Sequence, residues 1–171
     1  MKLLLLGSSG QLGQAFLHQP LWPQFHSLAL SRTQLDITDS AALAAQMAAY
    51  RPDVVLNCAA YTAVDNAEQQ SDSCFAVNAT AAGQLAALCQ QHNSLLVQFS
   101  TDYVFDGSKA SPYEVTDARN PLGVYGKSKA AGEEVIEQAF QSKQQHASQV
   151  SGAEFKAQYA ILRTSWVYGE G

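Results

Sequence analysis

A tyrosine and a lysine four residues apart are the first pair of side chains that could do chemistry. Tyr125 and Lys129 stand at positions i and i+4 of the segment YGKSK, and such positions share one face of a helix. A free tyrosine has a pKa of about 10, which is too high for efficient proton exchange near neutrality. A nearby cation favours the phenolate. The spacing therefore predicts that the Lys129 ammonium, or a cationic ring of a bound cofactor, lowers the pKa of Tyr125, which then serves as a general acid or base.

A hydroxyl group upstream could complete this set. Ser100 and Thr101 end an apolar run, and the carboxyl ends of parallel strands face the ligand crevice of an α/β sheet. We expect Thr101 to hydrogen-bond the substrate oxygen, with Ser100 as the alternative. Thr101 could instead be an ordinary strand-end cap, and Y-x-x-x-K pairs often occur by chance. The prediction therefore depends on the elements that surround these residues.

A glycine-rich turn near the start of the chain predicts a site for a dinucleotide. Gly7, Gly10 and Gly13 have the spacing G-x-x-G-x-x-G between a predicted strand and a predicted helix. In such turns the first glycine permits the tight bend, the second admits the pyrophosphate, and the third lets the helix pack closely on the sheet. The helix start then offers free N–H groups to the phosphates. The residues expected to hold the cofactor here are Gly7, Gly10, Gln11, Leu12 and Gly13.

The end of the second predicted strand bears on the choice of cofactor. An acid there binds the ribose hydroxyls of NAD, whereas an arginine accommodates the 2′-phosphate of NADP. Here Ser31 and Arg32 stand at that place without an acid. This favours NADPH, or tolerance of both NADPH and NADH, unless Arg32 is merely a solvated loop residue. Asp36 and Ile37 lie further on and could flank the adenine.

Strands and helices alternate along the chain as in a parallel sheet covered on both faces. With right-handed crossovers this gives an α/β fold with a doubly wound parallel sheet of the Rossmann type. A helix at 40–50 can be capped by Asp39 or Ser40. The predicted strands are residues 2–6, 27–30, 54–57, 95–100 and 160–163, and the predicted helices are 11–18, 40–50, 71–78, 79–92 and 121–141.

Two further segments are expected to be irregular. Residues 106–120 are rich in Gly, Ser and Pro and predict a loop. Pro121 suits the first turn of the helix that follows. Residues 142–156 are polar and rich in Gln and Ser, which predicts a mobile excursion.

Composition narrows the classes of partner. The 171 residues carry a net charge of −5 and no basic run, so nucleic acid and anionic membranes are not expected as partners. The apolar run at the N-terminus stops at Gly7, too short for a signal peptide, and no run is long enough to span a membrane. Cys58, Cys74 and Cys89 are odd in number and lack metal-ligand spacing, so we expect reduced thiols, no metal site and a cytoplasmic protein.

Several motifs in order along the chain resemble the extended short-chain dehydrogenase/reductases, and among them the dTDP-4-dehydrorhamnose reductases. Together they span nearly the whole chain. The segments that carry the resemblance are 7–13 (GSSGQLG), 35–39 (LDITD), 57–65 (NCAAYTAVD), 100–107 (STDYVFDG), 125–129 (YGKSK) and 162–169 (LRTSWVYG).

The resemblance implies reduction, by NADPH or NADH, of the 4-keto group of dTDP-4-dehydro-L-rhamnose to give dTDP-L-rhamnose, a step of nucleotide-sugar and cell-surface polysaccharide biosynthesis. It implies Thr101, Tyr125 and Lys129 as the catalytic set, with Tyr125 protonating the alkoxide and Lys129 also holding the nicotinamide ribose. The residues implied to line the cofactor are Ala59, Ala60 and Tyr61, and those implied to face the sugar are Val64, Asp102, Tyr103 and Trp166.

The resemblance also implies a second lobe that clamps the nucleotide sugar. We therefore expect residues 1–171 to be a truncated cofactor-binding Rossmann domain that lacks the C-terminal substrate lobe. Such a piece would turn over weakly or not at all by itself, because the contacts that position substrate and exclude water would be missing. A homodimer is possible for the full-length protein, and any metal at a dimer contact would lie mostly outside this segment.

Three alternatives share the predicted fold. A nucleotide-sugar dehydratase would carry Thr-Asp-Glu where Thr101, Asp102 and Tyr103 stand here, so the missing Glu argues against dehydration. An epimerase or another nucleotide-sugar reductase uses the same Tyr–Lys pair. A non-catalytic role like that of the regulatory subunit of methionine adenosyltransferase stays open as well, although the intact catalytic set favours an enzyme.

Overall fold

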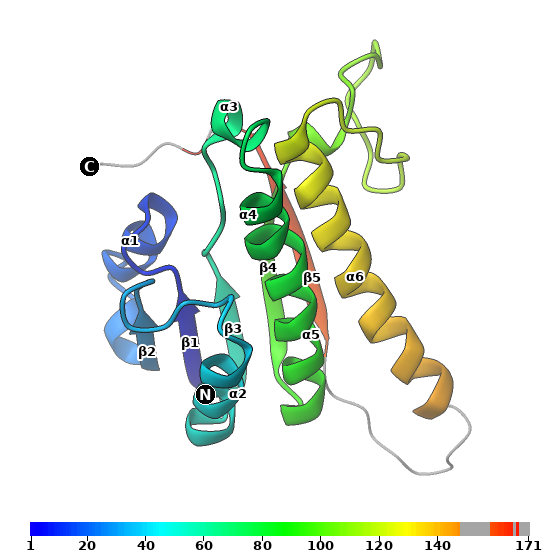
Figure 1. Cartoon of the computed structure of the whole chain (residues 1–171). Coiled ribbons are helices and arrows are strands. Elements are labelled where there is room, and N and C mark those ends of the chain that lie inside the picture. Colours follow the sequence, from blue (N-terminus) through cyan, green and yellow to red (C-terminus); the bar gives the residue numbers. More distant parts are fainter. Residues whose placement is uncertain (148–157, 166, 168–171) are drawn as a thin grey trace.

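A five-stranded sheet is the centre of the molecule (Figure 1). The computed structural model describes residues 1–147, 158–165 and 167, with side chains of 142–147 left out. All strand pairs are parallel, in the order β2-β1-β3-β4-β5, which confirms the predicted α/β class. The strands are β1 (Lys2–Leu6), β2 (His26–Leu30), β3 (Val54–Asn57), β4 (Leu95–Thr101) and β5 (Tyr159–Thr164).

The strand order places a switch point between β1 and β3. The chain passes from β1 to β2 on one side and then returns to β3 on the other side of β1. In open α/β sheets a ligand crevice forms where the strand order reverses, at the carboxyl ends of the strands. The turn after Leu6 and the loop after Asn57 both begin there, since these residues are paired in the sheet.

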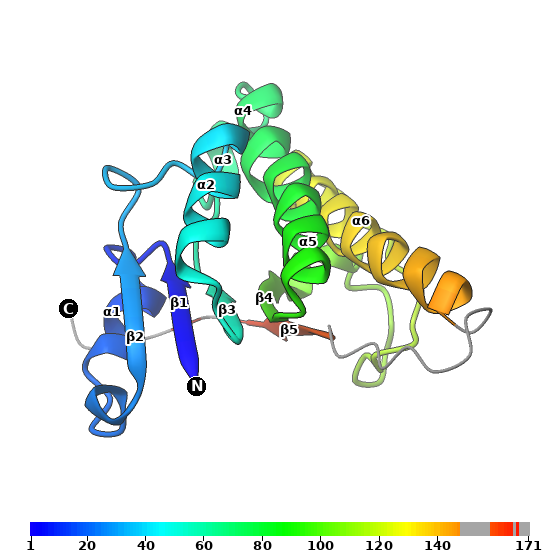
Figure 2. The same cartoon turned by 90° about the horizontal axis from the view of Figure 1, so that it is seen from below.

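Helices lie on both faces of the sheet. In Figure 2, α2 (Ser40–Tyr50), α5 (Ala81–His92) and α6 (Val124–Ala147) lie on one face, and α1 (Gln11–Leu17) lies on the other. The fold is therefore doubly wound as predicted. The main core forms between the first face and the sheet, where apolar side chains are almost fully buried and stabilise the fold by leaving water. Its largest members are Leu4, Leu6, Leu43, Met47, Leu85, Leu96, Ile136 and Phe140.

Two helices predicted as separate form one continuous path. A π-helical turn, η2 (Ala76–Thr80), joins α4 (Ser71–Phe75) to α5, and π-turns inside helices are frequent at functional sites. Here the turn holds Asn78, whose carbonyl lies where a Cβ on Gly132 of α6 would be. Short helical segments not predicted from the sequence are η1 (Trp22–Gln24), α3 (Val64–Ala67) and η3 (Asp102–Val104).

The ends of α6 differ from the prediction. The helix begins at Val124, three residues after Pro121, because the Glu68 carboxylate accepts the Val124 N–H at 2.8 Å and fixes the first turn there. At the other end the helix continues to Ala147, so the predicted excursion is wrong for residues 142–147. The remaining part of that prediction, 148–157, lies outside the described residues. In the described parts of the chain, none of the helices combines the length and apolar character needed to span a bilayer.

Replacing Gly132 by alanine should destabilise the chain, because the new methyl group would meet the rigid Asn78 backbone. Overpacking of this kind costs about 1–3 kcal/mol. Gly83→Ala is the matched control at the facing helix: its methyl would meet only the Val135 side chain at 3.1 Å, and alanine favours helix over glycine by about 1 kcal/mol. Urea unfolding of both variants measures this. Equal free energies of unfolding for the two variants would contradict the described contact.

Candidate active site

The glycine turn after β1 is shaped by two close backbone approaches. Gly7 has φ +76°, and a Cβ there would lie 2.6 Å from the Ala59 nitrogen of the loop after β3. A Cβ on Gly13 would collide with the Gly7 carbonyl. Only glycine fits at either position. At Gly7, L side chains rarely adopt the positive φ and a Cβ has no space, and at Gly13 a Cβ has no space. Gly13 therefore packs α1 on its own turn, where the sequence had predicted packing on the sheet.

Gly10 stands at the start of α1 with its outer side open. A Cβ there would make only ordinary contact, 3.4 Å from the Gly7 carbonyl. Gly10 offers no side chain to cap the helix, so the first N–H groups of α1, at Gln11 and Leu12, are not capped by it. Such groups carry partial positive charge and attract phosphate oxygens.

A first cavity of about 210 Å³ lies beside this turn. It joins the glycine turn to residues predicted to flank the adenine end of a cofactor. Arg32 forms an ion pair with Asp36 at 3.2 Å, but its side chain is 80% exposed, and an exposed pair of this kind is weak. The hydrogen bond from Thr38 lowers the pKa of Asp36. The lining residues are Gly7, Ser9, Gly10, Arg32, Leu35, Asp36, Ile37, Cys58, Ala59, Ala60 and Val77.

A second cavity, of about 300 Å³, continues from the first toward the tyrosine and the lysine. The two cavities share Gly10, Cys58, Ala59 and Ala60, and together they form what we call the nucleotide groove. The sequence-predicted residues Gln11, Leu12, Tyr125 and Lys129 lie on this second part. Its lining residues are Gly10, Gln11, Leu12, Asn57, Cys58, Ala59, Ala60, Thr62, Phe99, Ser100, Tyr125, Lys129, Thr164 and Val167.

Lys129 is a buried cation. Its side chain is 5% exposed, and its ammonium donates to the Phe99 carbonyl at 2.6 Å. Burial lowers the pKa of Lys129 to about 8, against the opposing effects of Glu133 and Cys74. The lysine can therefore exchange a proton close to neutral pH, which an exposed lysine does only with difficulty.

The expectation that the Lys129 ammonium lowers the pKa of Tyr125 is wrong. Burial raises the pKa of Tyr125, and the hydrogen bond with the Thr101 side chain opposes this only in part. The reason is that the phenol is half-buried while the Lys129 ammonium is bound to the Phe99 carbonyl. Desolvation of the phenolate outweighs the single favourable contact, which is with Thr101, and nearby groups such as Asp102 raise the pKa further. Tyr125 is thus held as the neutral phenol, and the two side chains still face the same cavity.

The two hydroxyls at the end of β4 have different surroundings. Thr101 donates to the Asp102 carboxylate at 3.0 Å and accepts the Tyr103 N–H at 3.2 Å. Ser100 lines the nucleotide groove and is 6% exposed, and its buried hydroxyl has no hydrogen-bond partner among the described residues. Such an unsatisfied buried hydroxyl is costly unless a ligand pairs with it.

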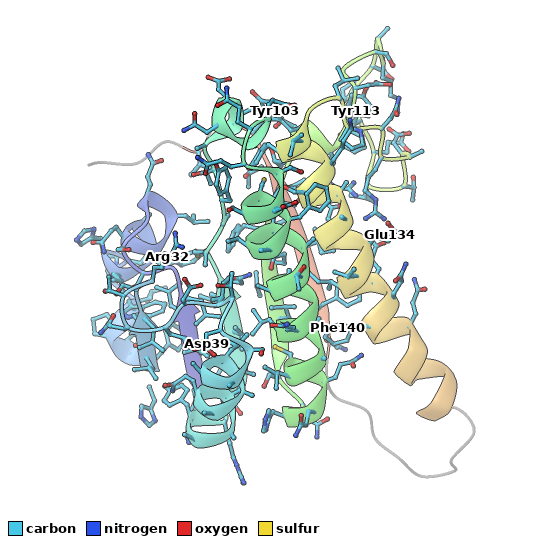
Figure 3. The ribbon with its side chains drawn as sticks, viewed as in Figure 1. Arg32, Asp39, Tyr103, Tyr113, Glu134 and Phe140 are labelled. Carbon is cyan, nitrogen blue, oxygen red and sulfur yellow. The ribbon has the colours of Figure 1, made fainter. Side chains whose placement is uncertain are left out.

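A third cavity, of about 430 Å³, lies on the other side of Tyr125. It brings together Val64, Asp102 and Tyr103, the residues expected to face a sugar. The rings of Tyr103 and Tyr125 meet edge to face with centroids 5.7 Å apart. In Figure 3, Tyr103 and Tyr113 lie at the same end of the sheet. The lining residues are Val64, Glu68, Asp102, Tyr103, Phe105, Asp106, Gly107, Tyr113, Leu122, Gly123, Tyr125 and Gly126.

Some predicted site residues do not line these cavities in the part of the chain that the structure describes. Gly13 lies beneath the turn, Ser31 bonds within its own turn to Thr33 and Gln34, and the Thr101 side chain hydrogen-bonds Tyr125. The Tyr61 backbone is held by the Asn78 side chain, at 2.9 Å and 3.0 Å. Trp166 lies outside the described residues.

Other lining residues were not predicted. Asn57, Cys58, Thr62, Phe99, Thr164 and Val167 line the nucleotide groove. Asn57 carried a readable signal, because it is a polar residue at the end of an otherwise apolar strand. Phe99 carried none, because it contributes a backbone carbonyl that any residue type has.

The sheet with its switch point and the groove above it define a Rossmann-type α/β domain. The chain belongs to the family described as RmlD substrate binding domain, whose model matches residues 1–171.

Named relatives agree with this family. The chain is 41% identical over 174 residues to a dTDP-4-dehydrorhamnose reductase of Mycobacterium tuberculosis, a match that covers 99% of the chain and 51% of that protein. The crystal structure of the Bacillus anthracis dTDP-4-dehydrorhamnose reductase in complex with NADP is similar, with 30% identity, a TM-score of 0.86, and coverage of 99% of the chain and 55% of that structure.

A reductase of the same name from Clostridium acetobutylicum has 36% identity and a TM-score of 0.86, with 100% of this chain and 55% of that one covered. The chain thus spans about half the length of the relatives that it matches.

Replacing Lys129 by methionine should stabilise the chain more at pH 7 than at pH 10. In the folded chain the pKa of Lys129 is about 8, and the unfolded value is about 10.4. Between these values the unfolded chain binds more protons, so the wild type gains stability as pH rises and the variant lacks this gain. Urea unfolding at both pH values should show the variant's advantage shrinking by on the order of 1–3 kcal/mol.

Lys127→Met is the control, because Lys127 is exposed on the same helix. Its effect should be the same at both pH values. An equally constant effect of Lys129→Met would contradict a buried ammonium.

Proposed function

We propose that residues 1–171 are the cofactor-binding part of a dTDP-4-dehydrorhamnose reductase, which uses NADPH or NADH to reduce the 4-keto group of dTDP-4-dehydro-L-rhamnose. The observation that carries the proposal is the continuous groove from the glycine turn to Tyr125 and Lys129. The printed names of the relatives, and the NADP in the Bacillus anthracis structure, support it.

The residues present fit a nicotinamide dinucleotide. The glycine turn leaves room for a pyrophosphate at the start of α1, and the buried Ser100 hydroxyl has no partner of its own within the described residues. The groove would hold the adenine side between Arg32, Asp36 and Ile37, and Lys129 would hold the nicotinamide ribose. When bound, the reduced cofactor supplies the hydride for the reduction.

The protonation state of Tyr125 suits a reductase. Reduction of a ketone leaves an alkoxide that needs a proton, so the donor must be protonated at neutral pH. A tyrosine is protonated at neutral pH even at its ordinary pKa, and burial raises the pKa of Tyr125 further. Thr101, which hydrogen-bonds Tyr125, would orient the phenol toward the substrate oxygen. Lys129, whose pKa is about 8, can return a proton toward the site after each turnover.

The third cavity suits a sugar better than a diphosphate. Three carboxylates line it, and no lysine or arginine is among its described lining residues. Carboxylates accept hydrogen bonds from sugar hydroxyls but repel phosphates. We therefore place the keto sugar between Tyr103 and Tyr125, and the dTDP diphosphate away from Glu68, Asp102 and Asp106.

The choice of cofactor should depend on Arg32. Arg32→Ala should weaken binding of NADPH by about tenfold, because a guanidinium–phosphate contact is charge-assisted, and should change NADH binding less than about threefold. Fluorescence titration of the purified chain with each cofactor measures this. Arg51→Ala is the control, since Arg51 is a distant, exposed arginine at the end of α2. Equal weakening of both cofactors by Arg32→Ala would contradict a role in phosphate recognition.

The function itself is tested in a full-length protein that contains these residues. With dTDP-4-dehydro-L-rhamnose and NADPH, Tyr125→Phe should lower kcat by about a hundredfold or more, because the general acid is lost. The dissociation constant for NADPH should change little. Tyr50→Phe is the control, since Tyr50 ends α2 and its hydroxyl donates to the His26 carbonyl, away from the three cavities. Undiminished turnover in Tyr125→Phe, or absence of sugar reduction in the wild type, would overturn the proposal.

A further inference from the structure

Two buried amide side chains stand side by side where β3 and β4 approach the nucleotide groove. Asn57 and Gln98 are paired in the register of the two strands and are 1% and 4% exposed. Both follow runs of Val and Leu in strands that otherwise bury apolar side chains on this face. A buried amide is unfavourable unless its donors and acceptors are satisfied, so this pair must be fully engaged to be tolerated.

The two amides form a chain of hydrogen bonds that starts in the groove loop. The Ala59 N–H donates to Asn57 Oδ1 at 3.2 Å, and Asn57 Nδ2 donates to Gln98 Oε1 at 2.7 Å. Gln98 Nε2 then donates to the Phe99 carbonyl at 3.1 Å. Each amide accepts with its oxygen and donates with its nitrogen, so the direction is consistent along the whole chain.

This series of hydrogen bonds ends on the same carbonyl oxygen that accepts the Lys129 ammonium. The Phe99 carbonyl accepts both Gln98 Nε2 and the Lys129 ammonium, the latter at 2.6 Å. A carbonyl oxygen has two lone pairs and can accept both donors at once. The amide of Gln98 and the Lys129 ammonium therefore share one acceptor.

We infer that Asn57 and Gln98 are positioning residues for Lys129, joining the loop that lines the nucleotide groove to the carbonyl that holds the lysine in place. The inference deepens the proposed function and rests on it for its catalytic meaning. Ala59 lines both parts of the groove, so a shift of that loop is transmitted to Lys129 through two rigidly bonded amides. None of the residues that line the third cavity takes part in these four hydrogen bonds.

The test uses the 171-residue chain and reads Lys129 directly. Lysine side chains labelled with ¹³C are titrated by NMR, with the Lys129 signal assigned by Lys129→Arg. In the wild type the signal should titrate near pH 8. In Gln98→Met, which keeps the shape but removes both hydrogen bonds of the amide, the Phe99 carbonyl loses the group that holds it, and its hydrogen bond to the ammonium should weaken. The pKa of Lys129 should then fall by about half a pH unit or more, further below its ordinary value, because the charged form is less well stabilised while burial is unchanged.

Affinity for NADPH, measured by fluorescence titration on the same samples, should fall by about three- to tenfold. Gln90→Met is the matched control. Gln90 is also a buried glutamine whose amide donates to a backbone carbonyl, that of Ala139, at the far end of α5. It should leave the titration of Lys129 and the NADPH affinity unchanged, although it perturbs the core in a similar way.

If Gln98→Met fails to fold, Gln98→Asn takes its place, because it keeps the amide but shortens its reach. A Lys129 pKa within about 0.2 of the wild-type value in the folded variant would overturn the inference, as would an equal shift in Gln90→Met. Failure of the wild type to bind NADPH or NADH would instead count against the proposed function. The lysine titration would still decide the positioning role.

Discussion

The close approach of Gly7 to Ala59 is the contact on which the site depends. It brings the turn after β1 against the loop after β3, and it exists only because Gly7 lacks a Cβ and adopts a positive φ. Parallel pairing of Leu6 with Asn57 sets the two segments at the same height. The groove then opens above the switch point of the sheet, and its floor is the backbone of these two loops. A side chain at Gly7 would separate them and remove the floor.

Burial governs the chemistry at the far end of the groove. The same low-dielectric surroundings raise the pKa of Tyr125 and lower that of Lys129, because each group loses water that would stabilise its charged form. The tyrosine stays protonated at neutral pH, and the lysine is brought into the range where it can gain or lose a proton. Opposite shifts in neighbouring groups are typical of sites that move protons.

Much of the fold and of the site could be predicted from the sequence. The strands and helices follow from the periodicity of apolar residues, and the turn and the Tyr–Lys pair follow from residue types at characteristic spacings. The glycine spacing, the apolar strands and the i, i+4 pair identified the sheet, the turn and the helix that carries Tyr125. The direction of the Tyr125 shift could not be predicted. It depends on how deeply the phenol is buried and on where the Lys129 ammonium finds its acceptor, and that acceptor is the backbone oxygen of Phe99. The start of α6 was missed for a similar reason, since it is set by the distant Glu68 carboxylate.

A crystal structure of the chain with bound NADPH tests the central claim most directly. The account predicts a dinucleotide lying across Gly7, Gly10 and Gly13, with the adenine beside Arg32 and Ile37. The nicotinamide carbon that gives up the hydride would then lie within about 4–5 Å of the Tyr125 hydroxyl, close enough for both to reach one keto group. A cofactor bound elsewhere, or a nicotinamide turned away from Tyr125 and Lys129, would contradict it.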